Sequence, residues 1–514
     1  MPVWAAWFAY HPDGMWARLG RVLSDDGPMG RSIALVLLAS AWVATWRPQV
    51  DPDAWWHISI GKAVLAAGAI PAVEPFSWLT AGDRFVAHSW LWDVLMAVAY
   101  GVGGATGTSV LVVPVTAAIV VAAWALIGIA APGMTPIARS AVVLLAIAAS
   151  LPLWAPRGQT LDVMFVLAMA LAIARYLRIG TRSGLLALPI VGVLWANLHG
   201  SALLGLVAML AIGLVTLPIG SRWGVWPRRP VAPLAVAGLA SLAAAVVNPY
   251  GPALLLYPFD RAVASAFSFD IIEWRSPDFR APELLLARVL VASALLLVAA
   301  WPRRRRDPFL LLTAAAWTFA AIGAVRFLPI AAMVVVVAAA PAIGPSIARW
   351  LGFKGAGAGD AQPSALRAAP FLATGAVASL AVLAVGWSFI APPAQEAAIA
   401  HRQPVAAVAV LEAQPCEGRT LPAYGWAGYV IEMTGREVGA FGNSAERPLG
   451  EQAAVEAVLI DPRPWLDGHE VDIALLPVTG PLSHWLDEAE GWRLAYRDAQ
   501  ASIHVRSDRP DCQL

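Results

Sequence analysis

A series of long apolar segments limits the folds that are open to this chain. Segments that approach the roughly 20 residues a helix needs to cross a bilayer recur from residue 32 to residue 391. Only 13% of the 514 residues are charged, whereas soluble domains carry about 25%. Mean hydropathy is +0.66. The sequence therefore predicts a polytopic α-helical membrane protein.

Charged residues between the apolar segments predict how the chain crosses the membrane. Arginine-rich joins at 178–182, 222–229, 303–306 and 349–367 are expected in the cytoplasm under the positive-inside rule. With the amino terminus in the cytoplasm, residues 50–106 begin outside, and an odd number of crossings must separate them from the cytoplasmic join at 178–182. Residues 50–106 are therefore expected to form one outer loop, whose two helices, near 55–65 and 88–100, lie along the membrane without crossing it. The expected spans are 32–49, 107–131, 139–154, 159–177, 185–197, 200–219, 232–247, 284–301, 308–325, 328–348 and 369–391.

Three regions follow from this topology. Residues 1–31 form a cytoplasmic or interfacial segment, residues 32–391 the transmembrane domain, and residues 392–514 a small extracytoplasmic α/β domain. In the last region we expect a helix over 404–414, a strand over 471–476 and a hairpin of 492–498 with 501–506. The two cysteines, Cys416 and Cys512, both lie there. An oxidising exterior permits a disulfide, but the sequence leaves their pairing open.

The sequence Asp51-Pro52-Asp53 directly follows the first span. Carboxylates beside hydrocarbon are costly and are functional candidates by default. One alternative is that Asp51 only caps a helix that has proline in its first turn. Capping explains one acid and leaves the second unexplained. We therefore expect Asp51 and Asp53 to act in catalysis or in metal binding.

Further polar residues are expected at the same outer ends of the helices, where they predict a shared cavity. Acids there can serve as a base or bind a metal, and arginines suit phosphate. Each also has a structural alternative, such as a snorkelling arginine, a tight turn, a hydrogen-bonded helix end or a local ion pair. The candidates are His57, His88, Arg157, Asn197, His199, Glu273, Arg275 and Arg326.

Several other chemistries have no signal in the sequence. It contains no glycine-rich phosphate loop with its lysine, no paired-cysteine metal motif and no Gly-x-Ser-x-Gly turn. The net charge of +1 suggests no nucleic-acid partner. A cavity on the outer face would also be remote from cytoplasmic nucleotides, so a lipid-borne substrate fits better.

The ordered motifs resemble the GT-C superfamily of polytopic glycosyltransferases, and more closely a group of bacterial membrane proteins within it. The resemblance rests on Asp51-x-Asp53-x-Trp55-Trp56-His57, Pro75-Phe76-Ser77, His88-x-Trp90-Leu91, Trp195-Ala196-Asn197-x-His199-Gly200, Asn248-Pro249-Tyr250-Gly251, Glu273-Trp274-x-Ser276-Pro277-x-Phe279 and Tyr424-Gly425-Trp426-x-Gly428-Tyr429. These motifs cover most of the chain, but they do not specify a substrate.

The resemblance implies a sugar donor on a polyprenyl phosphate and an envelope glycan, glycolipid or protein as acceptor, in a bacterial cytoplasmic membrane with the site facing outward. Asp51 or Asp53 would be the general base of an inverting transfer. Arg157 or Arg326 would neutralise the departing phosphate. Some relatives bind a divalent cation such as Mg or Mn and others need none. Here the ligands would be Asp51, Asp53 and Glu273.

Other readings stay open at this point. A transporter or flippase for lipid-linked glycans would place charges through the span centres and show internal pseudo-symmetry. A glycan polymerase or ligase would differ only in its acceptor, and a scaffold would tolerate loss of both acids. Tyr424, Trp426 and Tyr429 would either stack on a sugar or form the core of the C-terminal domain, and we favour the core.

Overall fold

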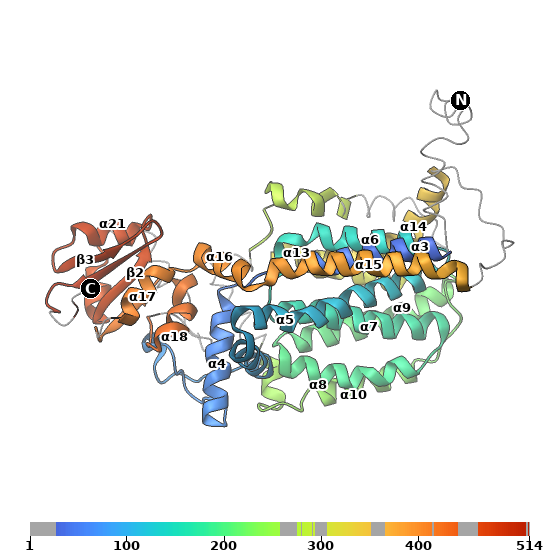
Figure 1. Ribbon diagram of the computed structural model, residues 1–514. Coiled ribbons are helices and arrows are strands. Elements are labelled where there is room, and N and C mark those ends of the chain that lie inside the picture. The colour runs from blue at the N-terminus through green and yellow to red at the C-terminus, as the bar shows by residue number, and fades with distance from the viewer. Residues whose placement is uncertain are drawn as a thin grey trace.

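We analysed a computed structural model of the chain. It describes residues 27–257, 275–278, 280–289, 291–292, 306–350, 365–413, 416–439, 461–509 and 512. The helices form an elongated bundle, and a small sheet domain lies at one end of it (Figure 1). The bundle comprises α3 (Pro28–Val43), α5 (Trp90–Ala130), α6 (Pro136–Ala149), α7 (Gln159–Ile179), α8 (Leu188–Leu198), α9 (Ala202–Arg222), α10 (Ala232–Ala244), α13 (Pro308–Gly323), α14 (Leu328–Trp350) and α15 (Ala365–Ile390).

The described helices match the expected spans closely. Five are long and apolar enough to cross a membrane by length and composition: Trp90–Ala130, Gln159–Ile179, Ala202–Arg222, Val325–Ala342 and Ala369–Arg402. Five shorter apolar helices coincide with further expected spans: Pro28–Val43, Pro136–Ala149, Ser183–Leu198, Ala232–Ala244 and Pro308–Gly323. The span expected at 284–301 lies largely outside the described residues. The chain is a multi-pass membrane protein, and the total of eleven spans stays a prediction.

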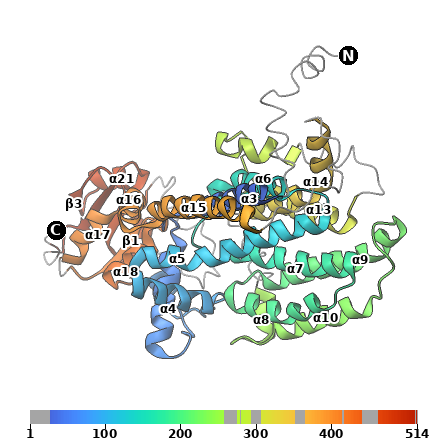
Figure 2. The same ribbon diagram turned by 45° about the vertical axis from the view of Figure 1, so that its right-hand side comes forward.

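The loop 50–106, which is predicted to lie outside and is called the first outer loop below, contains two helical pieces, as expected. Helix α4 (Asp53–Ala67) lies across the bundle axis at the end nearest the sheet domain, in both views (Figures 1 and 2). Helix α5 is bent at Gly103 and Gly104, where Gly104 has φ +57° and ψ −148°, a conformation open essentially to glycine. The bend divides α5 into a short piece near 90–102 and a long apolar piece.

Small residues allow close packing of the first and last bundle helices. Helix α15 lies against α3. A Cβ added at Gly375 would stand 2.6 Å from the Ser32 Cβ, and one at Gly386 would stand 2.7 Å from a Val43 methyl. The Ser32 hydroxyl also donates to the Phe371 carbonyl at 2.6 Å. Such small-residue contacts are typical of helix pairs within membranes, where hydrophobicity does not drive association.

The C-terminal domain contains a four-stranded sheet in the order β1-β2-β4-β3. Strand β1 (Arg419–Pro422) runs parallel to β2 (Val471–Pro477), and β4 (Ala501–Arg506) pairs antiparallel with β2 and with β3 (Trp492–Arg497). The expected strand and hairpin are confirmed, whereas the short strand β1 was not anticipated. The remaining helices are α16 (Pro392–Arg402), α17 (Val405–Ala413), α18 (Ala427–Thr434), α20 (Arg463–Gly468) and α21 (Pro481–Glu488).

Cys416 and Cys512 form a disulfide, which the sequence had left open. Their Cα atoms are 4.5 Å apart, and the two residues are separated by 96 positions in the chain. The bond ties the segment before β1 to the segment after β4, so both ends of the sheet domain are fixed together.

Backbone hydrogen bonds join the sheet domain to the first outer loop. Val438 forms isolated bridges with Ser77 of the loop and with Thr420 of β1. The Val438 N–H donates to the Phe76 carbonyl at 2.9 Å, and the Trp78 N–H donates to the Val438 carbonyl at 3.3 Å. Val438 therefore pairs with the edge of the sheet at β1, and Ser77 of the loop pairs with the other side of Val438.

Helix α18 also docks on α4, and the aromatic motif of the C-terminal domain lies in this contact. Tyr429 is buried and packs edge-on against Trp55, with ring centroids 4.9 Å apart. Trp426 is buried, and its indole N–H donates to the Arg402 carbonyl at 3.1 Å. Glu432 accepts a hydrogen bond from Ser59 at 3.0 Å and pairs with Lys62. Trp426 and Tyr429 therefore belong to the core, as favoured, whereas Tyr424 is exposed and the expectation of a core role is wrong for it.

Candidate functional site

Asp51 is held in place from two sides. Arg157, which precedes α7, donates from Nη1 to Asp51 Oδ2 at 2.9 Å, and the Asp53 N–H donates to Asp51 Oδ1 at 3.0 Å. The side chain of Asp51 is 4% exposed and that of Arg157 is 18% exposed. Asp51 thus caps the start of α4, as the structural alternative held, and also fixes a guanidinium at the end of the bundle. Asp53 is half-buried in the first turn of α4.

His57 lies one turn along α4 and contacts an acid that the sequence analysis missed. Its Nδ1 is 2.5 Å from Oδ1 of Asp93, whose side chain is fully buried. Burial alone lowers the pKa of His57. The hydrogen bond with Asp93 and the negative charges of Asp93, Asp53 and Asp51 outweigh it, so the pKa is raised above its ordinary value. All three acids therefore act on one imidazole.

His199 forms a second imidazole–carboxylate pair. Its Nδ1 lies 2.8 Å from Oδ1 of Asp162, in the first turn of α7. The same oxygen accepts from the Ser201 hydroxyl at 2.6 Å and from the Trp195 indole at 2.9 Å. A buried carboxylate on Nδ1 fixes the orientation and tautomer of a histidine and leaves Nε2 for another partner.

Two glycines bring these groups close together. A Cβ at Gly158 would stand 2.9 Å from His199 Cδ2, and one at Gly200 would stand 2.8 Å from His88 Cδ2. Gly158 directly follows Arg157, so the His199 ring lies against the segment that carries the guanidinium. His88 also stacks on Tyr257, with ring centroids 5.0 Å apart. Arg157, His199 and His88 therefore share one region.

Asn197 is engaged within the protein. Its Oδ1 accepts from the Trp90 indole at 2.8 Å, and its Nδ2 donates to the Val193 and Val247 carbonyls, each at 2.8 Å. These bonds tie α8 to the start of α5, within the first outer loop, and to the segment after α10. Asn197 therefore stabilises the packing of these three segments, and its expected contact with a substrate stays a prediction.

The second arginine lies at the start of α14. Arg326 is half-buried in a 3-10 turn at Val325–Phe327, and the Val325 N–H donates to the Arg275 carbonyl at 2.9 Å. The segments that carry Arg275 and Arg326 are therefore adjacent. Glu273 lies outside the described residues, and the roles of all three stay predictions.

Asp93 and Asp162 were absent from the sequence-based set, although a signal for them existed. Each is a lone carboxylate within an otherwise apolar helix, a pattern that marks functional or paired acids in membranes. Both lie in the first turn of their helices, so both belong to the same end of the bundle as Asp51.

A divalent cation fits the described residues poorly. The Arg157 guanidinium already neutralises Asp51, and both Asp51 oxygens accept hydrogen bonds from the protein. Among the described ranges, which exclude Glu273, no three histidine, cysteine or acidic residues form a group suited to a metal. We therefore derive no chemical step through a metal ion.

Comparison with solved structures identifies the fold. No protein-family model and no curated protein matches the sequence. The archaeal oligosaccharyltransferase AglB from Archaeoglobus fulgidus, in complex with an inhibitory peptide and a dolichol-phosphate, matches with a TM-score of 0.56 at 12% identity, over 87% of this chain and 69% of AglB. The Archaeoglobus fulgidus oligosaccharyltransferase in complex with Zn and sulfate matches with a TM-score of 0.53 at 14% identity, over 87% of this chain and 68% of that one.

A further match is ArnT from Cupriavidus metallidurans bound to undecaprenyl phosphate, at 16% identity and a TM-score of 0.47, over 92% of this chain and 97% of ArnT. The two oligosaccharyltransferase structures have TM-scores above 0.5, and the fold is assigned from them alone. Low identity limits the conclusion to architecture. The chain shares its fold with these two oligosaccharyltransferase structures.

Proposed function

We propose that this protein is an extracytoplasmic glycosyltransferase of a bacterial cytoplasmic membrane. It transfers a sugar from a polyprenyl-phosphate-type donor to an envelope glycan, glycolipid or protein. The observation that carries the proposal is Asp51, which pairs with Arg157 and accepts the backbone N–H of the neighbouring acid Asp53, at one end of an apolar bundle. The fold supports it, since a similarly folded oligosaccharyltransferase was solved with a dolichol-phosphate.

We assign the general base to Asp53 and a positioning role to Asp51. The Asp51 carboxylate is buried and accepts hydrogen bonds on both oxygens, which suits a positioning role, and Asp53 keeps part of its surface exposed in the first turn of α4. The acceptor hydroxyl attacks the anomeric carbon while Asp53 takes its proton late, and the bond between that carbon and the phosphate oxygen breaks. Direct displacement of this kind inverts the anomeric configuration. A positioned carboxylate typically contributes about 10²–10⁴-fold to such a step.

Arg157 is assigned to the leaving phosphate. Its guanidinium is oriented by Asp51, remains 18% exposed, and has N–H groups beyond the one that bonds Asp51. The departing oxygen takes the electron pair of the broken bond, and a fixed cation in a low-dielectric site stabilises that charge strongly. His199 is set against Gly158 by Asp162, which accepts the Nδ1 proton, so its Nε2 is left to accept a hydrogen bond from a sugar hydroxyl of the substrate.

The test is glycosyl transfer by the purified protein in nanodiscs, with a panel of polyprenyl-phosphate sugars and a membrane extract as acceptor source. Folded Asp53→Asn should lose at least about 100-fold in kcat. Asp461→Asn, at a carboxylate that is 51% exposed in the sheet domain, should retain full turnover. Equal turnover in wild type and Asp53→Asn would overturn the assignment of the base. Absence of turnover with every donor, while the lipid still binds, would favour the transporter reading.

A further inference from the structure

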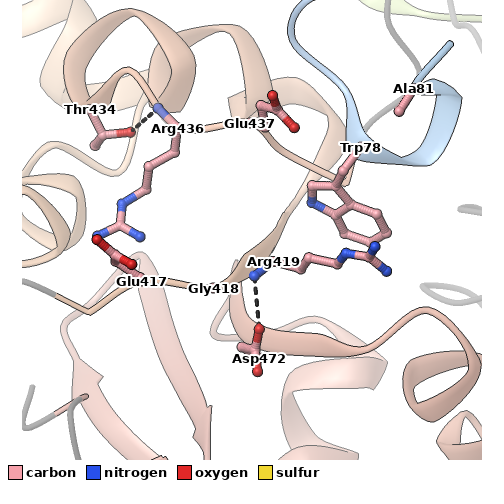
Figure 3. Close-up of a pocket in the computed structure, with 9 residues that line it drawn as sticks. All are labelled: Trp78, Ala81, Glu417, Gly418, Arg419, Thr434, Arg436, Glu437 and Asp472. Atoms are coloured by element: carbon pink, nitrogen blue, oxygen red, sulfur yellow. Dashed lines mark hydrogen bonds between the residues drawn. The ribbon is translucent and has the colours of Figure 1, made fainter.

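A polar pocket opens where the first outer loop meets the sheet domain (Figure 3). Its volume is about 680 Å³, within the roughly 300–1,000 Å³ of small-molecule sites. The loop contributes one wall and the segments around β1, α18 and β2 contribute the others. The lining residues are Trp78, Ala81, Glu417, Gly418, Arg419, Thr434, Arg436, Glu437 and Asp472.

The side chains that line the pocket are mostly charged, and both signs are present. Three carboxylates, two guanidinium groups and one hydroxyl surround the space, and Trp78 is its one large apolar side chain. Ligand pockets for apolar molecules are lined mostly by hydrophobic side chains. A lipid tail or an apolar peptide side chain would gain little here and would desolvate charged groups.

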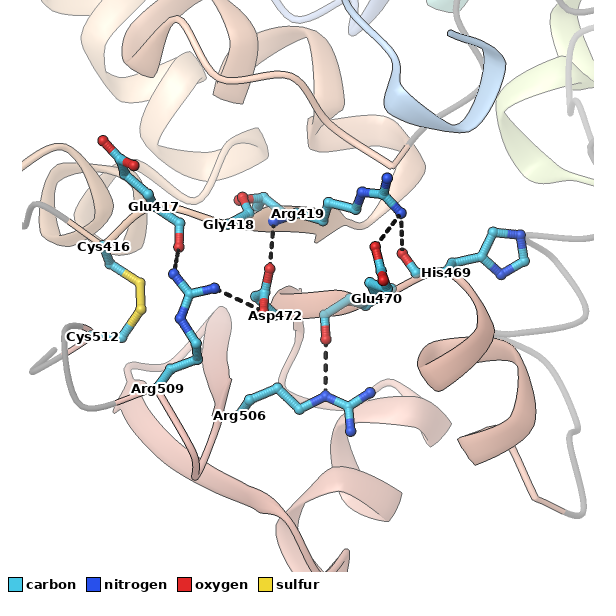
Figure 4. A network of polar contacts seen from close by, with 12 residues as sticks. Cys416, Glu417, Gly418, Arg419, His469, Glu470, Asp472, Arg506, Arg509 and Cys512 are labelled. Atoms are coloured by element: carbon cyan, nitrogen blue, oxygen red, sulfur yellow. Dashed lines mark hydrogen bonds and ion pairs between the residues drawn. A yellow bond between two sulfur atoms is a disulfide. The ribbon is translucent and has the colours of Figure 1, made fainter.

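One side of the pocket is rigidly built. The Trp78 indole N–H donates to the Thr420 carbonyl at 3.2 Å, and the Arg419 guanidinium lies 5.5 Å from the centre of the Trp78 ring. Arg419 also donates to the His469 carbonyl at 2.8 Å and pairs with Glu470 at 3.4 Å (Figure 4). The Trp78 ring therefore packs on the Arg419 guanidinium, which the His469 carbonyl and Glu470 also hold.

Asp472 and Glu417 form the base of the pocket. Asp472 accepts from the Arg419 backbone N–H at 2.9 Å and from Arg509 at 3.0 Å, and Arg509 also donates to the Glu417 carbonyl (Figure 4). Glu417 directly follows Cys416, so the disulfide anchors this wall as well.

The opposite side carries Arg436 and Glu437. The Arg436 N–H donates to the Thr434 hydroxyl at 3.3 Å, and the Arg436 side chain extends toward Glu417 (Figure 3). Burial lowers the pKa of Arg436 and the charge of Glu417 counteracts that effect. Glu437 lies between Arg436 and Trp78 and is exposed. Carboxylates and guanidinium groups thus face one another across the space.

We propose that this pocket binds a saccharide, the polyhydroxylated acceptor of the reaction. Sugar hydroxyls both donate and accept, so they can donate to Glu417, Glu437 and Asp472 and accept from Arg419 and Arg436. Trp78 belongs to the same outer loop as Asp53, so an acceptor seated here is tied to the loop that carries the base. This inference rests on the proposed function and narrows its acceptor from glycan, glycolipid or protein to one with a sugar chain.

The first experiment measures saccharide binding by the full-length protein in nanodiscs. The probe is a printed array of defined mono- to hexasaccharides, both neutral and uronic-acid-containing, followed by calorimetry on the best binder. Glu437→Gln and Arg436→Gln should each weaken Kd by about tenfold or more, since a hydrogen bond to a charged group contributes about 1.5–3 kcal/mol. Glu488→Gln and Arg463→Gln, at exposed positions of the same domain, should leave Kd unchanged.

The outcomes separate this inference from the proposed function. Asp53→Asn should abolish transfer and retain saccharide binding, because Asp53 does not line the pocket. If wild type binds none of the saccharides at millimolar concentration, the inference is wrong even where transfer is observed. Binding that is equally tight in Glu437→Gln and Arg436→Gln would also overturn it. So would capture of a basic peptide or inorganic phosphate with no saccharide bound.

Discussion

Replacing Arg157 with methionine should destabilise the protein by about 3 kcal/mol. Arg157 lies 2.9 Å from an Asp51 side chain that is 4% exposed, and breaking a buried ion pair from one side costs about 3–5 kcal/mol. The lower figure applies because 18% of the Arg157 side chain reaches the surface. Asp51→Asn should cost less, about 1–2 kcal/mol, since it leaves a partly exposed arginine and a side chain that still forms hydrogen bonds.

The double variant Asp51→Asn, Arg157→Met tests whether the two residues interact as described. Its loss of stability should fall short of the sum of the single losses by about 2 kcal/mol, within the range for contacting residues. The free energies of unfolding are measured by tryptophan fluorescence in mixed micelles. Losses that simply add would refute the ion pair as the source of the effect. In the transfer assay, Arg157→Met should lower kcat by about 10²–10³-fold.

The ion pair of Arg178 with Asp307 provides a control that separates the loss of stability in Arg157→Met from its loss of kcat. Arg178 lies 2.8 Å from Asp307, with side chains 19% and 2% exposed, so its burial resembles that of the Asp51–Arg157 pair. This pair joins the last turn of α7 to the start of α13, whereas Arg157 precedes the first turn of α7. Arg178→Met should cost comparable stability and leave the kcat of the folded fraction unchanged. A comparable loss of kcat would refute the role of Arg157 at the phosphate.

Three further perturbations test other parts of the structure. Gly158→Ala should lower kcat roughly tenfold, because its Cβ would stand 2.9 Å from His199 and displace that ring; transfer kinetics measure this. Joint replacement of Cys416 and Cys512 by serine should destabilise the sheet domain by roughly 4–5 kcal/mol, given a separation of 96 residues; thermal unfolding with and without reductant measures this. His504 is fully buried, and burial lowers its pKa while Asp487 partly offsets the effect. In the unfolded protein, His504 binds a proton near pH 6.5. The free energy of unfolding is therefore highest above that pH and falls below it by up to ~1.4 kcal/mol per pH unit. His504→Asn should flatten this dependence in unfolding titrations.

Each of these has a control. A Cβ at Gly133 would meet nothing within 4 Å, so Gly133→Ala should leave kcat unchanged. Reductant should have no effect on the serine variant, because Cys416 and Cys512 are the only cysteines in the chain. Stability that is independent of pH between 7 and 5 in wild type would contradict the buried, neutral state of His504.

The helical part of the fold was predictable because its signal is local. Apolar length identified the spans, and the bend in α5 at Gly103 and Gly104 falls between the helix expected near 88–100 and the span expected at 107–131. Strand β1 was missed because its four residues, Arg419–Pro422, are too short to show a period. Its pairing with β2 depends on a partner about fifty positions away, at Arg419 and Val471, and no local pattern encodes that.

The candidate site was predictable as a set of residues but not as a set of contacts. Polar residues at helix ends indicated the region that Asp51, Arg157 and His199 share. The sequence could not show that His57 would pair with Asp93, because that contact joins two elements whose relative placement is set by packing. The sequence likewise could not show that Asn197 forms its hydrogen bonds with Trp90 and two carbonyl groups.

The backbone link through Val438 has a consequence for how the protein is made. Trp78 meets its partner Thr420 only after 342 further residues have been synthesised, which takes roughly 20–70 seconds at the usual rates of translation. During that time the loop with both acids has been inserted but lacks the sheet edge that completes it. Assembly of the end of the bundle that carries Asp51 and Asp53 is therefore a late event in biogenesis. Termination before residue 420 should leave a bundle whose first loop is open to proteases.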